Sequence, residues 1–211
     1  MKFLRMVFGL SSCLTLFSLD YQIKTVPVLP MESYPARAAV GDVIIAADPY
    51  PTDERSFSAF DIKNLNSRGY FPIHVIIHNK SSSYLTIRIQ NVVLVTRSGQ
   101  HLYTTPGSML VADVFKSGKD PRPQATGIPG QSAAAKSGSP LFDFTSKELT
   151  NRLIDPGTVS DGFLFFFTPR PRSNPLIGGT LYIPKLEEEG TLKALGPFSI
   201  PLDPGIPSSQ K

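Results

Sequence analysis

The chain has 211 residues, enough for one domain of about 150 residues with a stable core and additional segments. Charged residues make up only 18% of it, and 20 prolines and 16 glycines separate short apolar runs, which favours β-strands over long helices. The formal charge of +4 comes from 21 basic and 17 acidic residues spread along the chain, and tryptophan is absent, so nucleic-acid binding has little support. The single cysteine excludes an intramolecular disulfide and a Cys-rich metal site.

Residues 1–19 are typical of an export signal. Lys2 and Arg5 precede a largely apolar run that is shorter than the roughly 20 residues of a transmembrane helix. Residues 10–13, Leu-Ser-Ser-Cys, resemble the bacterial lipobox, in which the cysteine is lipidated and becomes the new N-terminus. Cys13 is therefore a candidate lipidation site. A cleaved secretory signal, a retained membrane anchor and a buried N-terminal element remain alternatives.

The rest of the chain divides into four parts. Residues 20–39 contain several prolines without periodicity and are expected to form an extended tether. Residues 40–203 are expected to form a β-sandwich domain. Within this domain, residues 116–139 are rich in small residues, glycine and proline, and are expected to form a flexible insertion. Residues 204–211 are expected to form a disordered tail.

The centre of the predicted domain is the stretch 70–96. Two runs rich in β-branched and aromatic residues, 70–79 and 84–96, are separated by a polar break and predict adjacent antiparallel strands. The first run is apolar on nearly both faces, which predicts an inner strand. The second loses its alternation at 91–93, which predicts a β-bulge. Further strands are expected at 43–47, 101–103, 162–168, 179–184 and 196–202.

The sequence predicts one short helix with some clarity. Residues 145–148, Thr-Ser-Lys-Glu, match a capping box, and apolar residues follow at helical spacing as far as residue 153. Residues 52–67 fit a short helix or an irregular crossover equally well. Residues 186–191 are expected to form an acidic turn.

Histidines offer the strongest candidates for chemistry. His74 and His78 are roughly 13 Å apart on a strand, too far to share one metal ion, so a structural role is favoured for both. A hydrolase with groups from separate loops is a second possibility. That hypothesis pairs His101 with Asp113 or Asp161 in a deep pocket.

Other motifs of catalysis are missing from the sequence. It contains neither a Gly-x-Ser-x-Gly motif nor a glycine-rich phosphate loop. The acidic pairs at 53–54 and 187–189 stand in polar contexts where solvated charge is expected. Arg170 and Arg172, which alternate with prolines, are candidates for contact with an anion or an acidic partner. We therefore expect no catalytic residues, no metal site and no cofactor.

Four segments carry a resemblance to known proteins: 41–51 (GDVIIAADPYP), 71–79 (FPIHVIIHN), 156–166 (PGTVSDGFLFF) and 179–184 (GTLYIP). They resemble secreted bacterial proteins and lipoproteins with an immunoglobulin-like, telokin-like β-sandwich. The resemblance spans most of residues 40–202 and implies a non-catalytic domain of the cell envelope.

The strands by themselves predict an all-β, immunoglobulin-like antiparallel sandwich of seven to nine strands with one short helix. The expected function is that of a non-enzymatic binding or structural module. It would be tethered to a bacterial membrane on the extracytoplasmic side, in the periplasm or at the outer membrane. Its expected contacts are the membrane, through the N-terminal lipid or anchor, and an envelope protein. An accessory subunit of a larger envelope complex is the first alternative, and the hydrolase is the second.

Overall fold

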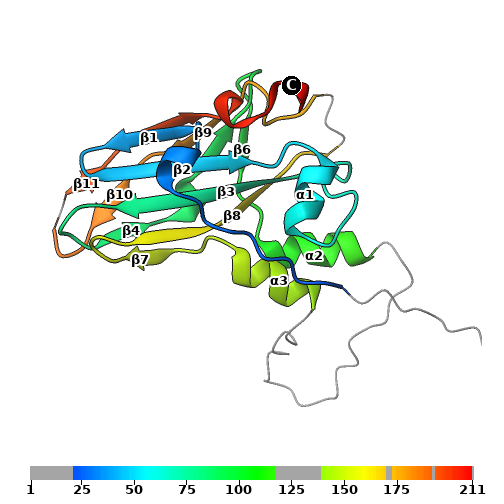
Figure 1. Cartoon of the computed structure of the whole chain (residues 1–211), viewed down its shortest axis with the longest axis horizontal. Coiled ribbons are helices and arrows are strands. Elements are labelled where there is room, and N and C mark those ends of the chain that lie inside the picture. The colour runs from blue at the N-terminus through cyan, green and yellow to red at the C-terminus, as the bar shows by residue number, and fades with distance from the viewer. Residues whose placement is uncertain (1–20, 117–138, 170–172, 192, 211) are drawn as a thin grey trace, which may run out of the picture.

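The structure is a computed structural model that describes residues 21–116, 139–169, 173–191 and 193–210. It is mostly β, with three antiparallel sheets of four strands (Figure 1). Sheet A has the order β1 (Arg37–Val40), β2 (Val43–Pro49), β3 (Tyr70–Asn79) and β8 (Val159–Phe167). Sheet B has the order β11 (Ala194–Leu195), β10 (Leu186–Glu188), β4 (Leu85–Ile87) and β7 (Arg152–Ile154). Sheet C has the order β12 (Phe198–Pro201), β9 (Thr180–Ile183), β5 (Val93–Val95) and β6 (His101–Tyr103).

Helices connect and flank the sheets. The α-helices are α1 (Asp53–Ala59), α2 (Gly107–Lys116) and α3 (Pro140–Lys147). Short 3-10 helices are η1 (Met31–Ser33), η2 (Ile89–Asn91), η3 (Asp203–Gly205) and η4 (Ser208–Gln210). The three α-helices lie together at one end of the molecule (Figure 1).

β3 is an inner strand, as predicted. It pairs with β2 on one side and with β8 on the other, and all of its residues except His78 are buried. Both hydrogen-bonding edges of β3 are therefore occupied. For this reason the expected pairing of residues 70–79 with the following run is wrong: β4 lies in sheet B, between β10 and β7.

The run 84–96 divides between two sheets. The 3-10 helix η2 separates β4, in sheet B, from β5, in sheet C, where a β-bulge was expected. An amide hydrogen bond fixes this break, because Ile89 N donates to Asn151 Oδ1 at 2.7 Å. The change of direction lets both halves of the run bury apolar side chains, Leu85 and Ile87 before it and Leu94 after it.

The main hydrophobic core contains side chains from all three sheets. Ile45 and Ile77 come from sheet A, Ile87 from sheet B and Leu181 from sheet C, and each is fully buried. Full burial of one such side chain stabilises the fold by about 1.5–3 kcal/mol. The inner face of sheet A is thus held against sheets B and C by apolar packing.

The opposite, outer face of sheet A carries an aromatic cluster under the helices. Phe60 stacks on Phe144 of α3 with ring centroids 4.2 Å apart, and it meets Phe163 of β8 edge-on at 4.9 Å. Phe165, next on the same face of β8, completes the cluster at 5.5 Å from Phe60. This packing positions α3 beside β8, which matters for the site described below.

The capping-box prediction is wrong, because α3 ends where the helix was expected to begin. Ser139 caps α3 instead, with its side chain accepting a hydrogen bond from Phe142 N at 3.2 Å. The chain after α3 is held extended against β8, since Leu149 N donates to Phe163 O at 2.9 Å. Gly162 permits this approach: a Cβ there would lie 2.7 Å from Leu149 N.

The described residues contain more elements than expected, with twelve strands in place of seven to nine and three α-helices in place of one. The additional strands are short. Leu186 is fully buried and pairs with both Ile87 and Leu195. The first three residues of the expected acidic turn therefore form the strand β10. In α2, Leu110 and Val114 form a buried stripe at four-residue spacing.

Both expected flexible ends include packed residues. Within the expected tether, β1 pairs with β2, and Tyr34 is buried on the outer face of sheet A with Ala46 and Ile76. Within the expected tail, Ile206 is 2% exposed and belongs to the main core. Residues 117–138 of the expected insertion lie outside the described residues, and the adjoining Lys116 and Ser139 belong to the end of α2 and the cap of α3.

Candidate functional site

The N-terminal strap, residues 21–34, lies across the outer face of sheet A and ends beside the α-helices (Figure 1). At its C-terminal end, Met31 and Tyr34 are buried, and the Tyr34 hydroxyl accepts a hydrogen bond from Leu29 N at 2.8 Å. Arg37 of β1 donates to the carbonyl oxygens of Met31, Glu32 and Tyr34. These contacts fix the strap to the strand that follows it.

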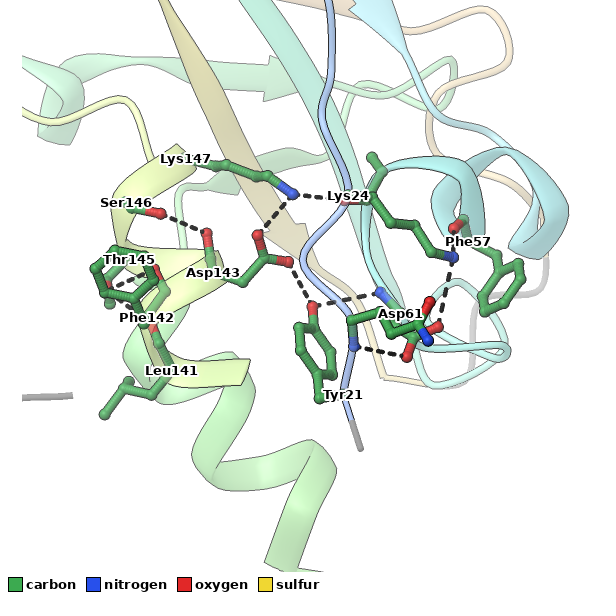
Figure 2. Close-up of polar contacts among 12 residues, drawn as sticks. Tyr21, Lys24, Phe57, Asp61, Leu141, Phe142, Asp143, Thr145, Ser146 and Lys147 are labelled. Atoms are coloured by element: carbon green, nitrogen blue, oxygen red, sulfur yellow. Dashed lines mark hydrogen bonds and ion pairs between the residues drawn. The ribbon is translucent and has the colours of Figure 1, made fainter. Parts of the chain in front are cut away.

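At its N-terminal end the strap is held by a polar group that we call the clamp: Tyr21, Asp143 and Lys147 (Figure 2). The Tyr21 hydroxyl donates to Asp143 Oδ2 at 2.6 Å, and Lys147 Nζ lies 2.6 Å from Asp143 Oδ1. Lys147 Nζ also donates to the carbonyl oxygen of Ala59 at 2.7 Å. Asp143 and Lys147 are four residues apart, so α3 presents both on one face.

The clamp is a buried charged group. The Asp143 side chain is fully buried and that of Lys147 is 16% exposed. Burial lowers the pKa of Lys147, and the adjacent Asp143 opposes that shift. Burial also raises the pKa of Tyr21, and its hydrogen bond to Asp143 adds to the effect. The hydroxyl is therefore a proton donor at any physiological pH, which is what the buried carboxylate requires.

A second set of contacts continues the attachment toward α1. Gln22 N donates to Asp61 Oδ2 at 3.0 Å, and Lys24 Nζ lies 3.5 Å from Asp61 Oδ1. Lys24 Nζ also donates to the carbonyl oxygen of Phe57 and lies 3.1 Å from the centroid of its ring (Figure 2). The strap is thus bound to two helices that are distant from it in sequence.

A histidine–carboxylate pair lies on the outer face of sheet A between the strap and the helices. His74 Nε2 is 2.7 Å from Asp161 Oδ2, and the imidazole stacks on Phe163 at 4.7 Å between centroids. The hydrogen bond from His74 lowers the pKa of Asp161. His74 is only 1% exposed, so the imidazole is enclosed by the protein, which favours a structural role.

Asp48 lies opposite His74 on the neighbouring strand β2 and extends this polar group. Its carboxylate accepts a hydrogen bond from Arg55 at 2.7 Å. Burial raises the pKa of Asp48, although Arg55 and His74 oppose the shift. Tyr34 of the strap is near enough that the charges of Asp48 and Asp161 add to the rise in its own pKa, which is caused mainly by burial.

A cleft of about 760 Å³ opens at the end of sheet C, beside the β5–β6 turn. Its described lining consists mainly of hydroxyl, amide and proline side chains, with Arg97 as the charged residue: Thr96, Arg97, Ser98, Gln100, Thr168, Pro169, Ser173, Asn174, Pro175 and Ile177. The cleft is therefore separate from the clamp and from the His74–Asp161 pair, and its lining offers hydrogen bonds rather than acid–base groups.

Comparisons with known proteins assign no family. None of the family models and none of the curated proteins matches the chain. Among solved structures, the chain is similar to the yjhA protein from Bacillus subtilis, at 10% identity and a TM-score of 0.37 over 71% of this chain and 78% of that one.

Two other bacterial structures are similar to this chain at a comparable level of identity and TM-score. One is described as a "putative lipoprotein", ycdA, from Bacillus subtilis subsp. subtilis str. 168, with 12% identity and a TM-score of 0.40 over 80% of this chain and 39% of that one. The other is a functionally unknown protein from Listeria monocytogenes EGD-e, with 10% identity and a TM-score of 0.35 over 70% of each chain. The structural neighbours are thus bacterial proteins of low identity. The telokin-like resemblance stays a prediction.

The structure separates the candidates for hydrolytic chemistry. His101 is exposed on β6, and within the described parts of the chain no hydrogen bond joins it to Asp113 or Asp161. Asp113 instead accepts a hydrogen bond from the Tyr70 hydroxyl at 2.9 Å, and burial together with this carboxylate raises the pKa of Tyr70 to about 12. The histidine that does meet a carboxylate is His74.

The remaining candidates have mixed outcomes. Cys13, Arg170 and Arg172 lie outside the described residues. His78 is on the same strand as His74, and no cluster of three potential metal ligands occurs among the described residues. Asp53 accepts hydrogen bonds from the backbone amides of residues 66 and 67, so it organises a turn. No described helix is both long and apolar enough to cross a membrane.

Sequence analysis did not identify the clamp. Tyr21 and Asp143 are separated by 122 residues, and neither belongs to a recognisable motif. The available signal is the four-residue spacing of Asp143 and Lys147, but the capping-box prediction places Asp143 before the helix and Lys147 in its first turn. Placing the helix at Ser139-Pro140, a cap followed by proline, would have revealed the pair.

Proposed function

We propose that this chain is a non-enzymatic binding or structural module that its N-terminal segment tethers to the extracytoplasmic side of a bacterial membrane. We further infer that the three sheets are arranged as an immunoglobulin-like sandwich, a proposal supported by the single core that they share. The export-type sequence of residues 1–19 and the lipobox-like Cys13 support the location.

The observation that carries the proposal is the clamp. When the first residues of a domain anchored through its N-terminus are firmly bound, the domain is held at a short distance from the anchor and its orientation is restricted. Here Tyr21 is held by the buried Asp143, and the strap continues along sheet A to Tyr34. From Cys13 to Tyr21 there are eight residue steps. At no more than ~3.6 Å per residue, they place the clamp within about 30 Å of a lipid on Cys13.

The experiment is fractionation of bacteria that express the full chain, combined with mass spectrometry of the mature N-terminus. The Cys13→Ser variant removes the thiol that would carry the lipid, and Ser11→Ala is a matched control in the same segment. We expect the unmodified chain and the control in the membrane fraction, accessible to protease added outside the cytoplasmic membrane. A diacylglycerol mass on Cys13, lost in Cys13→Ser, identifies the lipoprotein form. An uncleaved N-terminus in the membrane identifies a retained anchor. Recovery of the intact chain solely from the cytosol would contradict the proposal.

An accessory subunit of an envelope complex is a second candidate. It is favoured by large apolar side chains exposed on the helices near the clamp, with Met109 62% and Phe142 37% exposed. Co-purification from gently solubilised membranes would support it if the same partner is lost on Met109→Lys.

Arg170 and Arg172 are proposed to contact an acidic partner or anionic headgroups. The double substitution to glutamine should then weaken that association.

A further inference from the structure

The outward-facing residues of the four strands of sheet C include no aspartate, glutamate, lysine or arginine. Strand register places two rows across this face: His101, Val95, Thr180 and Pro201 in one, and Tyr103, Val93, Tyr182 and Ser199 in the other. The residues between them along each strand, such as Leu94 and Leu181, are buried in the main core. An antiparallel sheet that faces water on one side normally carries polar residues there. We call this surface the tyrosine face.

Two tyrosines dominate the tyrosine face. Tyr103 is 63% exposed and Tyr182 is 37% exposed, and both pair with Val93, which lies between them. Cα atoms of directly paired residues on antiparallel strands are about 4.5–5.5 Å apart, so the Cα atoms of the two tyrosines are about 10 Å apart. The valine side chain between the two tyrosines is smaller than either of them.

This spacing and the lack of charge point to one class of ligand. In a β-1,4-linked polysaccharide, alternate sugar rings present the same face and are separated by one disaccharide repeat, which is close to the distance between the tyrosines. The apolar faces of sugar rings pack on aromatic rings, and their hydroxyl groups bond to uncharged polar side chains such as those of Thr180 and Ser199. An uncharged face suits an uncharged chain, because no charge has to be desolvated without a partner.

The cleft beside the β5–β6 turn is a second, independent observation. It lies at the end of the same sheet and is lined by groups that form hydrogen bonds with hydroxyls, among them Ser98, Gln100 and Asn174. It could receive substituents or a branch of a chain bound nearby. We propose that the tyrosine face binds a neutral β-1,4-linked polysaccharide, with Tyr103 and Tyr182 stacking on alternate rings. The inference rests on the proposed function, for which it names the ligand.

The test is sedimentation of the detergent-solubilised full chain with insoluble cellulose, chitin or β-1,4-linked mannan. All three probes are neutral β-1,4-linked chains, and they distinguish a glucan from an N-acetylated chain and from a mannan. Tyr103→Ala, Tyr182→Ala and the double variant are compared with Tyr84→Ala, which removes a tyrosine that is 49% exposed outside this face. Circular dichroism and thermal melting establish that each variant is folded.

We expect about a tenfold loss of affinity for each single variant of the tyrosine face, and no change for Tyr84→Ala. Failure of the unmodified chain to bind any of the three polysaccharides overturns the inference, as does equal binding by the folded double variant. Loss of a protein partner, without polysaccharide binding, would assign the face to a protein and also overturn it. The binding test and the fractionation test are independent of each other. A chain that is anchored in the membrane but does not bind polysaccharide contradicts only this inference. A chain that binds polysaccharide but is confined to the cytosol contradicts only the proposed location.

Discussion

Removing one oxygen from the clamp tests whether the strap is part of the folded unit. The Tyr21→Phe substitution keeps the ring but deletes the donor of the 2.6 Å hydrogen bond to Asp143. Hydrogen bonds to charged groups contribute about 1.5–3 kcal/mol. Asp143 keeps its contact with Lys147, so the loss should fall within that range rather than above it. For a protein of this size, the loss corresponds to a decrease in Tm of about 3–12 °C.

Lys147→Met gives the more severe case. The variant removes the cation 2.6 Å from the fully buried Asp143 carboxylate and leaves that carboxylate without its counter-ion. Breaking a buried ion pair by removing one partner costs about 3–5 kcal/mol. The free energy of unfolding should therefore decrease in the order wild type, Tyr21→Phe, Lys147→Met.

Two measurements check this order. Urea denaturation gives the free energy of unfolding, and brief digestion with trypsin, followed by mass spectrometry, gives the rate of cleavage after Lys24. Both variants should accelerate this cleavage, because Lys24 is bound to Asp61 and Phe57 only while the strap is in place. Tyr84→Phe is the control, since its hydroxyl bonds to no described residue. Unchanged unfolding and unchanged cleavage in Tyr21→Phe would refute the role assigned to the clamp.

Three further substitutions test other parts of the fold. Gly162→Ala should destabilise the protein by about 1–3 kcal/mol in thermal melting, because its Cβ would meet the Leu149 backbone; an unchanged Tm would contradict the close approach. Asp161→Asn should cost about 1 kcal/mol at pH 7. Because His74 lowers the folded-state pKa of Asp161, this difference should shrink as the pH falls below about 4, and a difference that persists at pH 2 would argue against the pair. Burial raises the folded-state pKa of Glu148, so its carboxylate lowers stability once the pH exceeds that pKa. Glu148→Gln should therefore be at least as stable as wild type at pH 7 and lose any advantage near pH 4; urea titration at both pH values measures this.

Local sequence patterns were sufficient where a strand is buried on both faces or alternates regularly. Residues 70–79 are apolar on nearly both faces and rich in β-branched residues, which favours an inner strand, as β3 is. Residues 101–103, 162–168 and 179–184 were also correctly assigned to strands. Which strands pair was not determined locally, because pairing depends on which hydrogen-bonding edges the rest of the chain has already occupied.

Short elements and polar contacts required the tertiary structure. The two- and three-residue strands of sheet B carry too few residues to show a period, and β10 is defined by burial of Leu186 between Leu195 and Ile87, of which only Ile87 is distant in sequence. Asp143 appeared unremarkable in the sequence because its importance arises from a tyrosine 122 residues away. The sequence by itself predicted a β-rich domain, which the structure confirms, and an export signal before it, which stays a prediction. The tertiary structure decided that the residues between them are bound to the domain, because only folding brings the buried carboxylate of α3 to the start of the strap.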